Sequence, residues 1–199
     1  MTERTALSPP AWQLRYAPHV GYLPPFQPLF SELAGGTHLE EQVRFIAGQG
    51  FSGVLHPWIA SQPAESRREF ARMLRDHDLA AGCVVYTGLE QIMRPLWTSD
   101  ADADRTELLE MITKTADAAA EVGSSVMAVL VIGNADQPMD RQLSNVRENL
   151  ALAGRIAASR QMVLGVEPMQ ALPGMLFPTA RARFSLTLDN CLSIGWSAF

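Results

Sequence analysis

The sequence alternates short apolar runs with segments whose apolar residues recur at helical spacing. Such an order is typical of a parallel sheet whose strands are joined by crossover helices. The predicted strands are residues 14–19, 51–56, 81–86, 125–132, 162–167 and 184–189. Four helical faces lie between them, around Val43, Phe70, Ile112 and Val146. We therefore predict an α/β fold, a TIM-barrel-like parallel (β/α) domain that is incomplete, with about six strands rather than eight.

Length and composition fit one folded domain. The chain has 199 residues, of which 47% are hydrophobic, so it can bury a substantial core. We expect residues 1–13 to be an N-terminal extension and residues 14–199 to form the single incomplete barrel domain. Residues 169–183 are too few and too rich in proline for a full crossover helix. An irregular lid or a one-turn helix is expected there.

Charge and cysteine content exclude several classes of partner. The net charge is −5 and Lys114 is the sole lysine, which disfavours binding to nucleic acid. No window approaches 18 consecutive apolar residues, so no membrane span or signal peptide is expected. Cys83 and Cys191 lack the spacing of a metal or redox motif and cannot build a disulfide framework. A cytoplasmic location is the weak expectation that follows.

The apolar run at 162–167 delivers a carboxylate, Glu167, at its C-terminal end. Pro168 follows at once, so the backbone is expected to leave the sheet there. Parallel α/β proteins carry their chemistry at this end of the strands. Glu167 is therefore the first candidate for a catalytic residue, and a surface glutamate that merely ends a strand is the alternative.

Other polar residues fall at or just after predicted strand ends, where they could line a small polar pocket. The candidates for substrate binding are His19, His56, Tyr86, Glu90 and Asn134. A histidine at a strand end is more often a hydrogen-bonded rim residue, and that reading stays open. The glycine-rich phosphate motifs and the serine-nucleophile motif are missing from the sequence, so no nucleotide cofactor is expected.

Two segments carry a family resemblance. The run Val-Glu-Pro-Met at 166–169, followed by Leu-Pro-Gly-Met-Leu-Phe at 172–177, resembles the strand-five motif of hydroxypyruvate isomerase-like proteins. These belong to the wider xylose isomerase-like TIM-barrel superfamily of sugar isomerases and epimerases. The run Leu-Thr-Leu-Asp at 186–189 is similar to the family's strand six. The resemblance implies that Glu167 and Asp189 bind one divalent metal, Mg²⁺ or Mn²⁺, with further ligands from strands seven and eight.

The sequence also departs from the family pattern. Many relatives have a histidine three residues after the strand-six aspartate, whereas Leu192 stands at that position. Strand four ends at Gly133-Asn134 without the histidine of several relatives. DNA-repair endonucleases with histidine-rich metal clusters are therefore a poor match.

The resemblance implies an isomerase or epimerase of a small hydroxy-carbonyl compound, similar to hydroxypyruvate or a sugar. Such a reaction needs a base that removes a proton from carbon, a group that returns it, and positive charge near the enediolate oxygens. The alternative is a degenerate, noncatalytic barrel that binds a small molecule or stabilises a partner. An open six-stranded sheet has unpaired edges, so a homo-oligomer or a complex with another chain is expected.

Overall fold

The computed structural model describes residues 14–21, 28–168 and 174–177 of the chain. Its strands are β1 (Gly53–Val54), β2 (Ala80–Ala81), β3 (Val84–Val85), β4 (Val126–Val129) and β5 (Val163–Val166). Its helices are α1 (Ser31–Ala34), α2 (Leu39–Gly48), α3 (Ala64–Asp76), α4 (Leu89–Ile92), α5 (Asp102–Val122) and α6 (Met139–Ala158). Two 3₁₀ helices, η1 (Ile59–Ser61) and η2 (Leu96–Thr98), lie in the connections.

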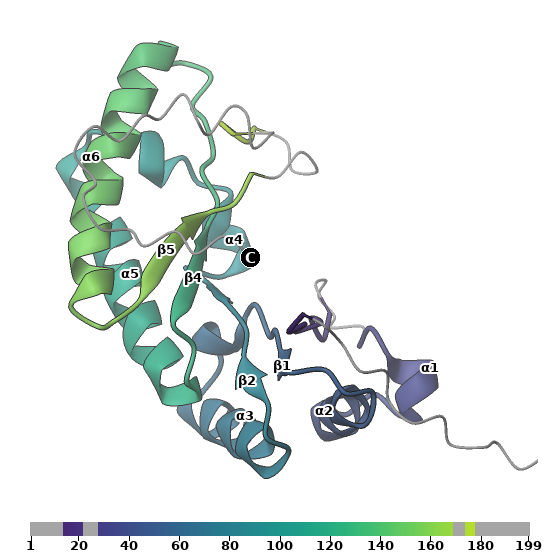
Figure 1. Cartoon of the computed structure of the whole chain (residues 1–199). Helices are drawn as coiled ribbons and strands as arrows, with labels where there is room; N and C mark the ends of the chain where they lie inside the picture. The colour runs from purple at the N-terminus through teal and green to yellow at the C-terminus, as the bar shows by residue number, and fades with distance from the viewer. Residues whose placement is uncertain (1–13, 22–27, 169–173, 178–199) are drawn as a thin grey trace, which may run out of the picture.

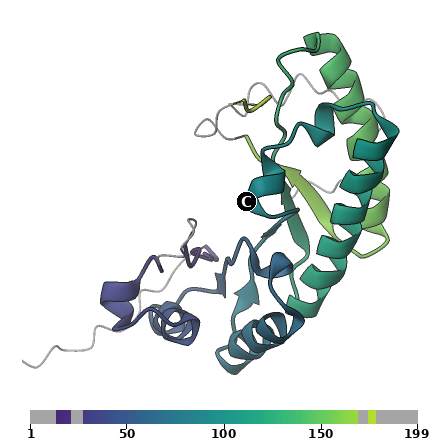
Figure 2. The ribbon, with the colours of Figure 1, turned by 180° about the vertical axis from the view of Figure 1, so that it is seen from behind.

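The elements form a crescent with helices outside and strands inside. Helices α3, α5 and α6 lie along the convex side, and the strands line the concave side (Figure 1). The view from behind shows the same two layers (Figure 2). All strand pairs are parallel, in the order β1-β2 and β3-β4-β5. The predicted α/β fold with parallel strands is confirmed, and the described residues do not close a barrel.

The first predicted strand, residues 14–19, is reduced to one parallel bridge between His19 and Leu55. The segment still runs beside β1, because the carbonyls of Tyr16 and Pro18 accept hydrogen bonds from Ser52 and Leu55. Pro18 faces β1 but has no N–H to donate, so the ladder is interrupted at that residue. The prediction of a regular strand here was wrong for this reason.

The third predicted strand, residues 81–86, is split into β2 and β3. Ala81 is in register with Val54, and Val84 with Met127; Val54 and Met127 are both fully buried under the helices. Ala81 and Val84 therefore point to the same face, although they are three positions apart. In a regular strand, residues three positions apart point to opposite faces, so the chain contains one extra residue at Gly82 and Cys83. At this bulge-like irregularity, the chain stops pairing with β1 and begins to pair with β4.

Two further predicted strands are confirmed, and two other predicted segments lie outside the described residues. Strands β4 and β5 fall inside the predicted ranges 125–132 and 162–167 and pair in register from Val126↔Val163 to Val129↔Val166. The sixth predicted strand, residues 184–189, lies outside the described residues, as does the extension at 1–13. The domain boundaries therefore stay a prediction.

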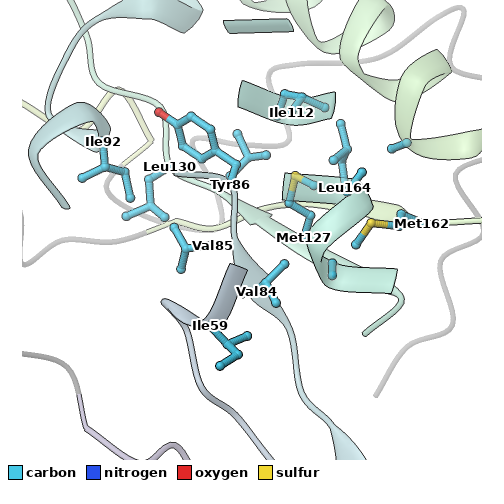
Figure 3. Packing of buried hydrophobic residues seen from close by; sticks show 14 of the residues in the cluster. Ile59, Val84, Val85, Tyr86, Ile92, Ile112, Met127, Leu130, Met162 and Leu164 are labelled. Carbon is cyan, nitrogen blue, oxygen red and sulfur yellow. The ribbon is translucent and has the colours of Figure 1, made fainter. Parts of the chain in front are cut away.

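The core lies between the strands and the helices. The helical face predicted around Ile112 is fully buried: Leu108, Ile112, Ala116 and Ala119 are each 0% exposed. In Figure 3, Ile112, Met127 and Leu164 gather on one side of the strands, while Val85, Leu130 and Ile92 gather on the other. Within the described ranges, no helix combines the length and the apolar character needed to cross a membrane.

Buried amides of α6 fasten the η2 connection to the helix layer. Asn149, which is 0% exposed, donates to the carbonyl oxygens of Trp97 and Ser99 at 3.0 and 3.1 Å. Asn145 donates to the carbonyl of Thr98 at 2.8 Å. Each bond satisfies a loop carbonyl that packing has removed from water, which would otherwise cost about 1–3 kcal/mol. The loop that follows β3 and α4 is thereby held in place at the C-terminal ends of the strands.

We predict that Gly82→Ala destabilises the protein by about 1–3 kcal/mol, the usual cost of overpacking. A Cβ atom at this position would lie 2.8 Å from Leu55 Cβ and 2.9 Å from Leu55 Cα, so backbone must move. Gly154→Ala is the matched control, because its Cβ meets open space inside α6 and alanine favours the helix. Urea unfolding should show a loss for the first variant and a gain for the second; equal stabilities would contradict the close approach at Gly82.

Candidate active site

The strand register decides which predicted site residues share a face. Residues in register on neighbouring parallel strands point to the same side, and successive residues point to opposite sides. Met127 and Leu164 are paired and both are buried under the helices, so they define the outer face. Leu130 and Glu167 follow the paired residues Val129 and Val166. They stand three positions after Met127 and Leu164, so they point to the opposite, inner face, which is the concave one.

Glu167 lies directly after β5, at the C-terminal end of the strand. Its backbone N–H donates to the carbonyl of Val129 at 2.9 Å, which extends the ladder by one residue and fixes the backbone from which the carboxylate projects. Burial raises the pKa of the Glu167 carboxyl above its ordinary range, because the charged form loses hydration. In the described part of the chain no hydrogen bond or ion pair to a cation holds this carboxylate. A partly desolvated carboxylate of this kind is able to exchange a proton.

Cys83 is a neighbour of this carboxylate that the sequence analysis did not select. It is half-buried in the irregular link between β2 and β3. Burial raises the pKa of the Cys83 thiol, and the nearby Glu167 carboxylate raises it further. The thiol therefore stays protonated beside Glu167. The Gly-Cys pair inside an apolar run was the available signal, since a glycine in a strand pattern often marks a bulge.

His19 shares the inner face with Glu167. Its bridge to Leu55 places the two residues in register, and Leu55 is one position from the buried outer residue Val54. The side chain is half-buried, and burial lowers the pKa of His19. A neutral imidazole on this face can donate or accept a hydrogen bond.

His56 and Tyr86 lie on the outer face. The ring of His56 packs edge-on against Phe70 of α3, with centroids 5.5 Å apart. Tyr86 is 0% exposed, and its ring meets Trp97 edge-on at 5.5 Å. Burial raises the pKa of Tyr86 to about 12. The pleat thus separates these two predicted substrate-binding residues from Glu167, although all of them stand at strand ends in the sequence.

Glu90 and Asn134 occupy the connections beyond the strand ends. Glu90 is exposed in the first turn of α4. The side-chain oxygen of Asn134 accepts a bond from the N–H of Asp136, and Gln142 of α6 bonds both backbone groups of Asn134 at 2.8 Å. Asn134 is therefore fixed to the start of α6. Asp189, the second expected metal ligand, lies outside the described residues.

The segment Gly174 to Phe177 covers the end of β4. An antiparallel bridge joins Met175 to Ile132, and the carbonyl of Gly174 accepts a 2.7 Å bond from the N–H of Gly133. Phe177 is 2% exposed, which anchors the far end of the segment in the core. An irregular lid or a one-turn helix was predicted for residues 169–183, and the described part, residues 174–177, pairs with the chain just after β4.

A metal site cannot be completed from the described residues. Glu167 offers one hard oxygen donor, which suits Mg²⁺ or Mn²⁺. Within the ranges that the structure describes, no group of three or more His, Cys, Asp or Glu side chains could hold a metal ion. The described part therefore fits the expected metal only through this one carboxylate.

Comparison with known proteins identifies the family. The model of the xylose isomerase-like TIM barrel matches residues 43–186. The chain belongs to this family. No curated protein matches the sequence. The resemblance to the xylose isomerase-like superfamily is thereby confirmed.

Solved structures share the fold at low identity. An AP endonuclease, family 2, from Brucella melitensis superposes with a TM-score of 0.62 at 15% identity, covering 87% of this chain and 64% of that one. A D-tagatose 3-epimerase-like protein gives 0.62 at 16%, covering 87% and 61%. A D-allulose 3-epimerase from Methylomonas sp. gives 0.63 at 15%, covering 87% and 57%. The chain therefore spans about three fifths of the length of these structures.

Acidification should destabilise the protein through His56. Burial lowers the pKa of His56 to about 4 from an ordinary value of 6.5, so the unfolded chain binds a proton that the folded protein excludes between these pH values. Stability is fully present above pH 6.5 and falls toward pH 4, by about 3 kcal/mol at most for this one group.

Urea unfolding across pH 4 to 7 checks this expectation. His56→Gln should flatten the pH dependence, and His19→Gln should flatten it less, because His19 is the more exposed of the two. Identical slopes in the wild type and His56→Gln would contradict the burial of a neutral imidazole.

Proposed function

We propose that this chain supplies the Glu167 side of the active site of an isomerase or epimerase that acts on a small hydroxy-carbonyl compound. The observation that carries the proposal is the position of Glu167. It lies at the C-terminal end of β5, on the inner face, and burial raises its carboxyl pKa. This is the end of the strands at which enzymes with a TIM barrel place their catalytic groups.

The chemistry needs a carboxylate of this kind. Glu167 removes a proton from the carbon next to the carbonyl; the C–H bond breaks and its electron pair forms the enediolate. Return of the proton to the neighbouring carbon, with transfer of the hydroxyl proton to the former carbonyl oxygen, completes an isomerisation. Return of a proton to the opposite face of the same carbon, from a second group, completes an epimerisation. Desolvation increases the basicity of Glu167, which favours the first step.

The substrate class is part of the proposal. Two of the superposed structures are described as acting on, or resembling enzymes that act on, D-allulose and D-tagatose. Their likeness to this chain is one of fold, and it makes ketoses the first substrates to examine. Hydroxypyruvate is the second, from the resemblance of residues 166–177 to hydroxypyruvate isomerase-like proteins. His19 on the same inner face is the candidate for a hydrogen bond to a substrate oxygen.

A divalent metal is proposed as the cofactor, without a nucleotide. Glu167 and Asp189 would contribute oxygen ligands, and Mg²⁺ or Mn²⁺ would supply positive charge beside the enediolate oxygens. The further ligands would come from residues other than those the structure describes. The proton itself is transferred by the carboxylate of Glu167.

We predict that Glu167→Gln lowers turnover by about 10²–10⁴, the range for loss of a positioned acid or base, without unfolding the protein. Glu110→Gln is the control, since it removes a carboxylate from the exposed face of α5. Turnover is measured on D-tagatose, D-allulose and hydroxypyruvate, with circular dichroism to verify folding. Unchanged turnover in Glu167→Gln on an accepted substrate would contradict the assignment.

The same variants address the noncatalytic alternative. A protein that binds one of these compounds but turns none over supports a binding role. Metal content measured after purification without chelator tests the cofactor separately. Stoichiometric metal that is lost in Glu167→Gln supports a ligand role, whereas retained metal assigns Glu167 to proton transfer alone.

The assembly expected from the sequence stays a prediction. Leu14, Leu29 and Leu33 are 64%, 54% and 69% exposed, and large apolar side chains in water favour association. We expect sedimentation at micromolar concentration to show a homo-oligomer, or a complex when a partner chain is supplied. A monomer that binds no dye for exposed apolar surface would contradict this expectation.

A further inference from the structure

A pocket lies on the outer face, the face opposite to that of Glu167. It has a volume of about 290 Å³, and its described lining consists of Leu39 and Gln42 of α2 together with Val20, Pro28, Thr37, His56 and Gln62 from the connections. Val20 and His56 form its floor, since both stand on the outer face at neighbouring positions after the Leu55 bridge. This size suits a small molecule. The pleat that places Glu167 on the inner face therefore also places His56 in a separate cavity.

Gln42 of α2 gives this pocket a fixed wall. Its side chain is 1% exposed, and its oxygen accepts a 3.0 Å bond from the N–H of Phe30. Its amide nitrogen donates to the carbonyl of Gly36 at 2.8 Å. The two bonds tie both ends of the segment around α1 to the buried face of α2. The pocket is thus framed by a buried, hydrogen-bonded side chain.

Among the residues that the structure describes, the lining is uncharged and divides into apolar and polar parts. Val20 and Leu39 present hydrocarbon, whereas Thr37, His56 and Gln62 carry polar groups. Burial keeps His56 neutral above its pKa of about 4. An anion would have to give up its hydration without meeting a cation among these described lining residues, which is costly. A neutral ligand with hydroxyl groups meets no such cost, because hydroxyls exchange hydrogen bonds with threonine, histidine and glutamine.

We propose that this outer-face pocket binds a small neutral polyol, with its hydroxyl groups toward Thr37, His56 and Gln62 and its C–H groups toward Val20 and Leu39. The site is independent of the reaction proposed for Glu167. His56, which the sequence analysis predicted to bind the substrate, would then bind a different ligand.

Histidine ring resonances provide the test, because the chain has only four histidines. Erythritol is titrated to roughly 100 mM, above the millimolar Kd of a weak ligand, and the carbon-bound ring protons are followed by NMR at pH 7. We expect the His56 resonance to move in a saturable way, whereas the resonance of His77, at the C-cap of α3, stays. Thr37→Val, which removes one hydroxyl and keeps the side-chain shape, should weaken binding about three- to tenfold, the effect of one neutral hydrogen bond.

Three controls separate the outcomes. Thr106→Val removes a hydroxyl from exposed α5 and should leave the titration unchanged. Glu167→Gln should also leave it unchanged, so failure of the proposed reaction and failure of this pocket are distinguishable. A His56 resonance that does not respond to erythritol overturns the proposal, and so does one that responds equally to inorganic phosphate, because the pocket would then not be selective for neutral ligands.

Discussion

The alternation of side chains across the parallel strands is the constraint on which the rest of the structure depends. Val54, Met127 and Leu164 are 0%, 0% and 7% exposed because the helices cover the face to which they point. Burial of that face fixes the register, since a slip of one residue would turn all its apolar side chains outward. Once the register is fixed, the direction of every residue at a strand end follows. Glu167 and His19 lie on the concave face, and His56 and Tyr86 lie beneath the helices.

Buried polar side chains then hold the connections at the C-terminal ends of the strands. Thr115 donates to the carbonyl of Tyr86 at 2.7 Å, while Asn149 and Gln142 of α6 fasten the two connections that follow. These bonds link the helix layer to the backbone around the inner face. They compensate for desolvated loop carbonyls, so the connections adopt one arrangement instead of many. The proton transfer proposed for Glu167 would benefit from such support, because catalysis is sensitive to small changes in distance.

The two faces of the strands present different electrostatic environments. On the inner face, burial raises the pKa of Glu167, and its carboxylate in turn raises the pKa of Cys83. On the outer face, burial lowers the pKa of His56, and the described residues of its pocket carry no charge. Desolvation is the common cause, but it acts in opposite directions on an acid and a base. One layer of strands can therefore separate the proton-transfer site proposed at Glu167 from the neutral binding pocket proposed at His56.

The sequence by itself determined the alternation of strands and helices, the buried face of α5 and the position of Glu167 at a strand end. These features are local: periodicity and a following proline specify them within a few residues. Pro18 also carried a local signal that its segment could not form a full ladder. Only the tertiary structure decided that the alternation slips at Gly82 and Cys83, and that His56 and Tyr86 turn away from Glu167. The face to which a strand residue points is set by its register with neighbouring strands and by the helices packed on them, and both arise from contacts between residues far apart in the chain.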